Sequence, residues 1–155
     1  MTTRADIADI AVYDKQDQLV LVGEVKNKLA AAPEWAGRFR RNILAHGIYP
    51  SAPFFLFAFP DTFYLWTASH QPLEYTEPDF TIDARPLLRP YFEQAGVQPE
   101  QISESSLELI IAAWLDEIIH TTVAPEALTA GQPWLIESGL YAAIAGGRLA
   151  QEVAV

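Results

Sequence analysis

The sequence contains no cysteine, and this absence excludes several kinds of chemistry at once. Disulfide bonds, thiolate metal sites and cysteine nucleophiles all need a residue that the chain does not have. No apolar run reaches the ~18 residues of a membrane-spanning helix. The N-terminal stretch "MTTRADIADIAVYD" lacks the continuous apolar segment of a signal peptide. We therefore expect a soluble cytoplasmic protein with no membrane partner.

Basic residues are also scarce. Ten Lys and Arg stand against twenty Asp and Glu, so the formal net charge is −10. Because phosphate contacts require Lys and Arg, this overall charge disfavours nucleic acid as a partner. The distribution is uneven, however: residues 1–41 hold seven of the ten basic residues, whereas residues 42–155 hold fourteen of the twenty acidic ones. The basic cluster consists of Lys26, Lys28, Arg38, Arg40 and Arg41. Such a cluster is typical either of a solvated surface or of a phosphate-binding site.

The remaining composition is that of a globular protein. Half of the 155 residues are hydrophobic, which suits one domain with its own core. Within this domain we expect an α/β core over residues 1–69 and a proline-rich connector over residues 70–100, with a short helix at "RPLLRPYFEQAG". We expect a helical part over residues 101–155, which either packs on the core or dimerises.

The first part of the chain shows strand patterns on both sides of one helical pattern. Trp35, Phe39 and Ile43 recur at four-residue spacing and predict a helix with one apolar stripe. The polar "KQDQ" suits a hairpin loop between the first two strands. The expected elements are strands at "DIAVYD" and "LVLVGEVK", a helix at "APEWAGRFRRNILAHG" that stops at Gly47, and strands at "PFFLFAFP" and "FYLWTA".

The last part of the chain shows two helical patterns. The first is "SESSLELIIAAWLDEIIH", with Ser103 or Ser105 as the N-cap residue. The second covers residues 132–154, with a break at Gly146-Gly147. Because these segments are apolar and rich in small residues, we expect a homodimer that associates through them.

A short hairpin would bring three charged residues together. If the four residues of "KQDQ" form the loop, Asp14 lies opposite Leu19 and Asp9 lies opposite Glu24. Opposite residues share a face, with Cβ atoms roughly 4.5–5.5 Å apart. Lys26 is two residues beyond Glu24 and shares that face. A slip of one residue would separate the three side chains, so the prediction depends on the register.

Two carboxylates at this distance repel each other unless a cation lies between them. Their hard oxygen atoms suit Mg²⁺ or Mn²⁺, and the carbonyl of Val25 is a further candidate ligand. Such a metal polarises a phosphodiester and lowers the pKa of bound water, while a nearby Lys stabilises developing charge or orients the water. The alternative is structural: Asp9 begins a strand, and Glu24 with Lys26 forms an ion pair that protects an edge strand from aggregation.

Asp9 followed by Glu24-Val25-Lys26 at the end of the next strand, and then by an amphipathic helix and further strands, resembles the PD-(D/E)XK superfamily of restriction-endonuclease-like nucleases. The resemblance covers about residues 4–67. It implies a mixed β-sheet core made of a hairpin, a helix and two further strands. It also implies Asp9 and Glu24 as metal ligands and Lys26 as the catalytic Lys. Lys28, Arg38 and Arg41 are candidates for phosphate contacts, since the two Arg residues share a helix face.

The sequence departs from the family pattern before Asp9. Ala8 stands where the family often has Pro, and only eight residues precede Asp9. Those residues are too few for the helix and strand that usually begin the core, and a carboxylate that some members take from that helix is missing. We therefore expect the sheet edge beside Asp9 to be exposed, or covered by a partner chain or by the C-terminal helices.

These observations leave three functions open. The first is a nuclease, acting as an endonuclease or an exonuclease, that hydrolyses phosphodiester bonds of DNA or RNA with Mg²⁺ or Mn²⁺. The second is a catalytically inactive, nuclease-like binding or assembly module that oligomerises through its C-terminal helices. The third is an antitoxin-like or immunity-like protein whose acidic half binds a basic partner.

Overall fold

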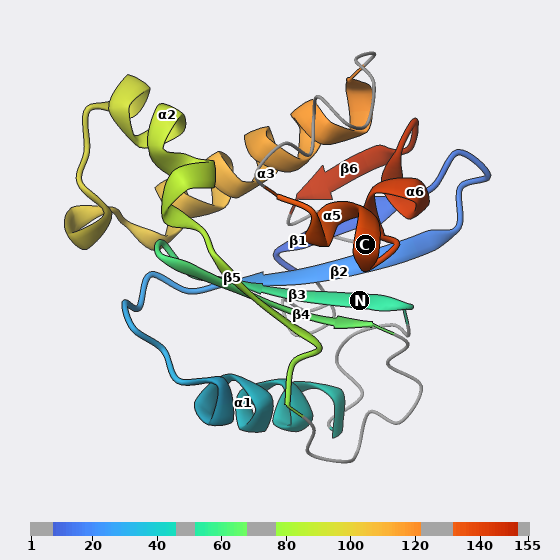
Figure 1. The fold of residues 1–155 in the computed structure, drawn as a ribbon, viewed down its shortest axis with the longest axis horizontal. Helices are drawn as coiled ribbons and strands as arrows, with labels where there is room; N and C mark the ends of the chain where they lie inside the picture. Colours follow the sequence, from blue (N-terminus) through green and yellow to red (C-terminus); the bar gives the residue numbers. More distant parts are fainter. Residues whose placement is uncertain (1–7, 46–51, 68–76, 122–131, 152–155) are drawn as a thin grey trace, which may run out of the picture.

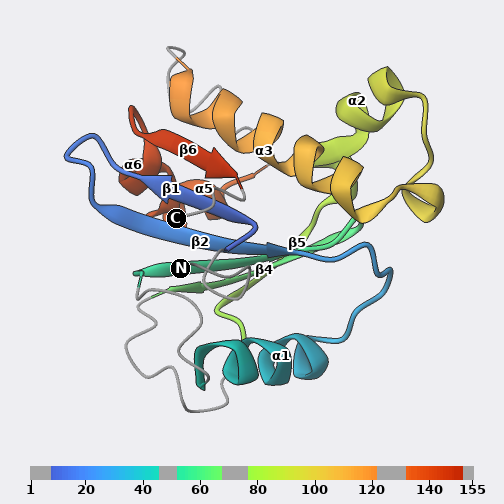
Figure 2. The same cartoon turned by 180° about the vertical axis from the view of Figure 1, so that it is seen from behind.

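In a computed structural model of the chain, six strands form one sheet that has helices on both faces (Figures 1 and 2). The structure describes residues 8–45, 52–67, 77–121 and 132–151. The strands are β1 (Ile10–Tyr13), β2 (Leu19–Val25), β3 (Phe54–Ala58), β4 (Thr62–Thr67), β5 (Phe80–Asp83) and β6 (Arg148–Gln151). The helices are α1 (Pro33–Ala45), α2 (Arg85–Ala95), the 3-10 helix η2 (Pro99–Gln101), α3 (Glu104–His120), α5 (Trp134–Glu137) and α6 (Leu140–Ile144).

The sheet is mixed, with the strand order β5-β4-β3-β2-β1-β6. β2 and β3 run parallel, and every other neighbouring pair runs antiparallel. Parallel neighbours need a crossover connection, and α1 lies in the connection between β2 and β3. The prediction of an α/β fold built on a hairpin, a helix and two further strands is therefore confirmed at the level of the elements.

The helices form two unequal layers. Figures 1 and 2 show α1 on one face of the sheet, with α2, α3, α5 and α6 on the other face. β2 is apolar along most of its length because both of its faces are covered. Val22 faces the core beneath α1, whereas Leu21 and Val25 belong to the larger core beneath α3.

α1 has the apolar stripe that its sequence predicts. Trp35 and Phe39 pack against a cluster of buried aromatic side chains that includes Phe57. The pattern "FFLFAF" alternates across β3: Phe55 and Phe57 face α1, whereas Leu56 faces the other layer. The predicted helix stop at Gly47 lies outside the described residues.

α3 is the longest of the described helices, and its start agrees with the prediction. Ser103 is the N-cap residue, and its side chain accepts a hydrogen bond from the backbone N–H of Ser106 at 3.1 Å. The apolar side of α3 is buried against α2, α6 and the sheet within the same chain. The homodimer was predicted from this apolar face, and the face is already covered within the chain.

The prediction of one helix over residues 132–154 is wrong. The segment forms the short helices α5 and α6, followed by β6. Gly139, between the two helices, has a φ of 84°, which glycine adopts without steric cost. At Gly147 a Cβ atom would lie 2.0 Å from the carbonyl oxygen of Tyr13, so only glycine allows this close approach between the chain before β6 and the end of β1.

β6 also corrects the expectation for the sheet edge beside Asp9. That edge is not exposed and is not covered by helices; β6 pairs with β1 along its whole length, from Ile10 opposite Gln151 to Tyr13 opposite Arg148. At the other end of the sheet, β5 lies within residues 70–100, where only a connector with a short helix was expected. That short helix is α2. All three predicted parts of the chain therefore contribute strands to one sheet.

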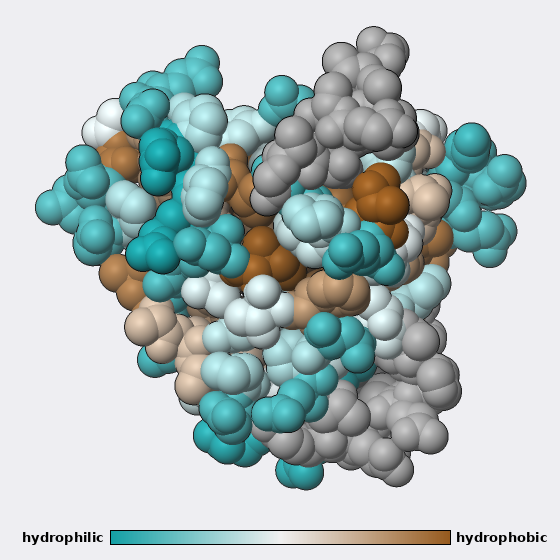
Figure 3. All heavy atoms as spheres, viewed as in Figure 1, coloured by the Kyte–Doolittle hydropathy of each residue, from teal (hydrophilic) through white to brown (hydrophobic). Residues whose placement is uncertain are grey.

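The surface carries few large apolar side chains. Among the described residues, Leu29, Leu109 and Ile136 are exposed. Figure 3 shows hydrophobic side chains gathered near the middle of one face, among hydrophilic ones. None of the described helices is long and apolar enough to cross a membrane.

Candidate functional site

The hairpin of β1 and β2 has the register that the sequence predicts over Ile10–Val12, but the loop differs. Ile10 lies opposite Gly23 and Val12 opposite Leu21, which places Asp9 beside Glu24 at the open end. The predicted pairing of Asp14 with Leu19 is wrong, since Leu19 pairs with Tyr13 and the register shifts between Val12 and Tyr13. A β-bulge of this kind adds one residue to one strand. Because Tyr13 pairs with Leu19, the loop covers residues 14–18 and is longer than predicted. The extra residue Val20 in β2 compensates for this and restores the register that places Asp9 beside Glu24.

Asp9 closes the open end of the hairpin. Its Oδ2 accepts a hydrogen bond from the backbone N–H of Val25 at 2.9 Å. This N–H points toward the β1 side, where the strand itself begins only at Ile10. Because the N–H and C=O of one residue in a strand point to the same side, we expect the carbonyl of Val25 also to face Asp9. A carboxylate has several oxygen lone pairs, so it can accept more than one hydrogen bond or bind a metal ion in addition.

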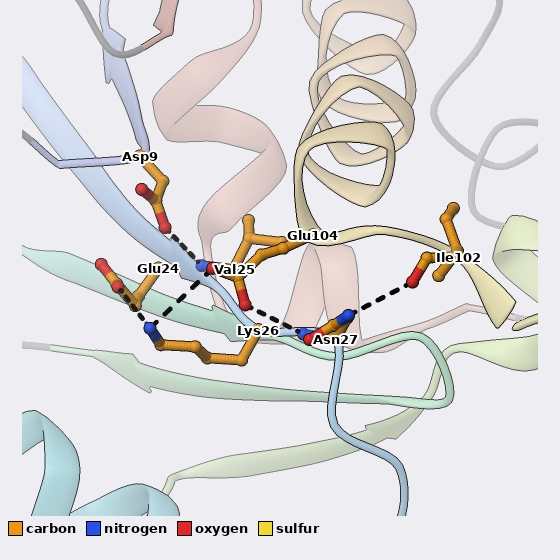
Figure 4. Close-up of polar contacts among 7 residues, drawn as sticks. All are labelled: Asp9, Glu24, Val25, Lys26, Asn27, Ile102 and Glu104. Atoms are coloured by element: carbon orange, nitrogen blue, oxygen red, sulfur yellow. Dashed lines mark hydrogen bonds and ion pairs between the residues drawn. The ribbon is translucent and has the colours of Figure 1, made fainter. Parts of the chain in front are cut away.

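Glu24 and Lys26 lie on one face of β2, as their spacing predicts. The Lys26 Nζ is 3.9 Å from Glu24 Oε1, and Figure 4 shows both side chains near Asp9 at the end of this strand. Glu24 is only 9% exposed, and β2 is an inner strand with β1 and β3 on its two sides. The ion pair of the structural alternative is therefore present, but its expected position on an edge strand is wrong. We call Asp9, Glu24 and Lys26 the carboxylate–lysine cluster.

The aromatic side chains of α1 position the basic residues that follow β2. The Lys26 Nζ lies 5.4 Å from the centre of the Phe39 ring, and the Lys28 Nζ lies 5.3 Å from the ring of Trp35. Both distances are typical of cation–π contacts. The backbone N–H of Lys26 also donates to the carbonyl of Ala58 on β3 at 3.1 Å. β2, β3 and α1 thus fix the direction in which these two ammonium groups point.

The connection from Lys26 to α1 is held at several points. The backbone N–H of Ala30 donates to Asp61 Oδ2 at 3.0 Å, and the hydroxyl of Tyr64 donates to the carbonyl of Ala31. Ala30 has a φ of 53°, an uncommon conformation for a residue other than glycine. Hydrogen bonds on both sides of this turn keep it in place, so the start of α1 is fixed relative to the carboxylate–lysine cluster.

Glu104 is a further member of this site that the sequence analysis missed. Its Oε2 lies 4.0 Å from the Lys26 Nζ, and its Oε1 accepts a hydrogen bond from the backbone N–H of Asn27 at 3.4 Å (Figure 4). The Asn27 side chain donates to the carbonyl of Ile102 at 3.3 Å. The sequence shows only an acidic residue in the first turn of a helix, which is a common position for Glu. Its contact with Lys26 depends on the tertiary packing of α3.

The basic cluster divides into two groups in the structure. Lys28, Arg38 and Arg41 are exposed, as phosphate contacts require. Arg40 is instead 2% exposed, and its guanidinium lies 5.6 Å from the ring of Phe55 and 5.1 Å from that of Trp66. Burial lowers the pKa of Arg40, and the charge of Asp79 opposes this effect. Arg40 therefore belongs to the core beneath α1 and not to a binding surface.

The oxygen donors of the cluster suit a magnesium ion. Mg²⁺ in proteins commonly binds one or two carboxylates and retains several water ligands. Asp9 and Glu24 offer two such carboxylates at the end of the hairpin, and the carbonyl of Val25 is the expected third oxygen donor. Across the described ranges, no group of three or more His, Cys, Asp and Glu side chains could hold a metal ion. A site here would therefore depend on two carboxylates, with water and substrate oxygen atoms as the other ligands.

A groove on the described surface lies elsewhere. It measures about 440 Å³ and lies between α2 and α3. Tyr91 donates a hydrogen bond to Glu117 in this groove, and burial together with this bond raises the pKa of Tyr91. No member of the carboxylate–lysine cluster lines the groove.

Comparison of the chain with protein-family models, with curated proteins and with solved structures finds no match. The similarity to the PD-(D/E)XK superfamily therefore stays a hypothesis based on the residues of the motif. The function of the cluster has to be inferred from its geometry and its chemistry.

Proposed function

We propose that the chain is a metal-dependent nuclease with a restriction-endonuclease-like core and the carboxylate–lysine cluster as its active site. The observation that carries this proposal is the position of Glu24. Glu24 is only 9% exposed on an inner strand, Asp9 lies beside it at the end of the hairpin, and two carboxylates placed together cost free energy on folding. A cation bound between the two carboxylates would offset their mutual repulsion.

The strand order supports the proposed core. The Asp-bearing strand β1 pairs with β2, α1 crosses over to the parallel strand β3, and β4 follows antiparallel to β3. The strand that the family usually has before Asp9 would lie beside β1, and β6 occupies this place. α3 packs against β6 from the adjacent layer. A C-terminal strand and helix would thus complete a core whose N-terminal elements are absent from the described residues.

In this proposal each side chain has one role. Asp9, Glu24 and the carbonyl of Val25 would bind a Mg²⁺ or Mn²⁺ ion, which activates water and polarises the phosphate. Lys26 would stabilise the negative charge that develops on the phosphate oxygens or orient the attacking water. In the reaction, water adds to phosphorus, the P–O bond to the leaving oxygen breaks, and the water proton passes to solvent or to that oxygen. Lys28, Arg38 and Arg41 would bind neighbouring phosphates.

A second candidate function also has an observation in its favour. Asp9 already accepts the N–H of Val25, and Glu24 already has Lys26 beside it. The cluster can therefore persist without a metal ion, as in an inactive nuclease-like module. The chain would then bind a partner or assemble through other surfaces, and the acidic residues 42–155 would favour a basic partner.

Calorimetric titration of Mn²⁺ into the wild type and Glu24→Gln distinguishes the two functions. We expect millimolar or tighter binding by the wild type and a loss of about tenfold or more in the variant, because one of two carboxylate ligands is lost. Glu93→Gln, which changes an exposed residue of α2, is the matched control and should leave binding unchanged. Cleavage of end-labelled DNA and RNA in the same buffer should follow metal binding. A wild type that binds no Mn²⁺ and cuts neither nucleic acid would favour the inactive module.

A further inference from the structure

Lys26 contacts two carboxylates that come from different parts of the chain. Glu24 Oε1 lies 3.9 Å from its Nζ, and Glu104 Oε2 lies 4.0 Å from the same atom. The two acidic side chains differ in exposure: that of Glu24 is 11% exposed and that of Glu104 is 46% exposed. The ammonium group thus has one partner inside the proposed metal site and one partner outside it.

This arrangement matters because an ammonium group and a divalent cation compete for the same carboxylate. Both are attracted to Glu24, and they repel each other at short distance. A cation bound by Asp9 and Glu24 would weaken the contact between Lys26 and Glu24. Lys26 then needs a second negative charge, which keeps its ammonium group beside the metal site but outside the position of the metal ion. Glu104 offers that charge.

Glu104 is well placed for this task because its own position is fixed. It is the first residue of α3, directly after the N-cap residue Ser103. Its Oε1 accepts the N–H of Asn27, and the side chain of Asn27 donates to the carbonyl of Ile102. These contacts join the end of β2 to the start of α3 and hold Glu104 beside Lys26 (Figure 4).

We infer that Glu104 is a positioning residue that holds the Lys26 ammonium beside the metal site and so allows a divalent cation to bind to Asp9 and Glu24. The inference rests on the proposed metal site and extends it to α3. Glu104 does not bind the metal ion itself; it acts through Lys26.

A double-mutant cycle tests this role without an activity measurement. Mn²⁺ affinity is measured by calorimetry for the wild type, Glu104→Gln, Lys26→Met and the double variant. We expect Glu104→Gln to weaken binding by about two- to fivefold, the usual range for a partly exposed charge pair. Lys26→Met should strengthen binding, because a competing positive charge is removed. In the Lys26→Met background, Glu104→Gln should have little effect, since no ammonium is left to position.

Glu100→Gln is the matched control, because it removes the same charge from the exposed 3-10 helix just before α3 and should leave the affinity unchanged. Urea unfolding of each variant confirms that the fold is intact. An equal or larger loss of affinity on Glu104→Gln in the Lys26→Met background would show that Glu104 acts on the metal directly, and would overturn the inference. So would an unchanged affinity in the wild-type background. A wild type that binds no Mn²⁺ would instead overturn the proposed function.

Discussion

At the scale of single residues, Glu24 and Arg40 show two ways in which this chain buries charge. Arg40 lies between aromatic rings on the α1 side of the sheet, where its guanidinium gains cation–π contacts. Glu24 is buried next to Lys26, whose Nζ lies 3.9 Å from Glu24 Oε1. Arg40 is thus buried against aromatic rings, whereas Glu24 is buried beside an ammonium group.

This difference predicts the effect of a conservative change at Arg40. Arg40→Lys should lower the free energy of unfolding by about 1–3 kcal/mol, because a Lys ammonium cannot stack as a plane on Phe55 and Trp66 and is more strongly hydrated. Urea unfolding followed by tryptophan fluorescence measures the change. Arg41→Lys, at the exposed neighbouring position, should stay within about 0.5 kcal/mol of the wild type. Equal urea midpoints for the two variants would mean that the aromatic contacts of the buried Arg40 guanidinium do not contribute to the stability of the fold.

At the scale of elements, the segments that the sequence predicts best are those with a strong local pattern. β2, α1, β3, β4 and α3 each carry a long apolar run or an apolar stripe, and each forms where it is expected. The register of the hairpin could also be predicted, since one face of β1 must be buried at Ile10 and Val12. The bulge could not, because neither "KQDQ" nor "LVLVG" contains a residue that demands it.

The elements that the sequence missed are those fixed by their partners. β6 has the sequence "RLAQ", which favours a helix more than a strand, and it is extended because β1 offers an unpaired edge. β5 is similarly short and pairs only with β4. The contact of Glu104 with Lys26 was missed for the same reason. It joins residues that are far apart in the chain, and no local spacing reveals such a contact.

The role of β6 leads to a test at this scale. Removal of residues 148–155 should lower the free energy of unfolding by roughly 2–4 kcal/mol, at ~1 kcal/mol for each lost ladder hydrogen bond. It should also cause association that increases with concentration, because the exposed edge of β1 can pair with another chain. Thermal denaturation and analytical ultracentrifugation measure the two effects. Removal of residues 152–155 alone, which spares β6, is the control; a similar loss in both truncations would contradict this role.

At the scale of the whole molecule, charge is divided between two regions. The exposed Lys28, Arg38 and Arg41 lie on or beside α1, whereas residues 42–155 hold three basic and fourteen acidic residues. A nucleic acid would therefore be attracted to the α1 side near the cluster and repelled by much of the remaining surface. The homodimer stays a prediction without structural support, because the apolar side of α3 is buried within its own chain.

This division predicts weak nucleic-acid binding with a definite dependence on salt. If Lys28, Arg38 and Arg41 each neutralise one phosphate, the slope of log K against log[salt] should be about −2.7 for double-stranded DNA, at about −0.9 per contact. Fluorescence anisotropy at several salt concentrations measures this slope. Replacement of all three residues by Gln should bring the slope close to zero.

The matched control replaces Arg85 and Arg89 by Gln, since both lie on α2 in the layer on the other face of the sheet. Its slope should equal that of the wild type. A control that loses the salt dependence while the triple variant keeps it would place the phosphate contacts on α2. The nucleic acid would then approach the chain from the face opposite α1, and the basic residues that follow β2 would have no part in binding it.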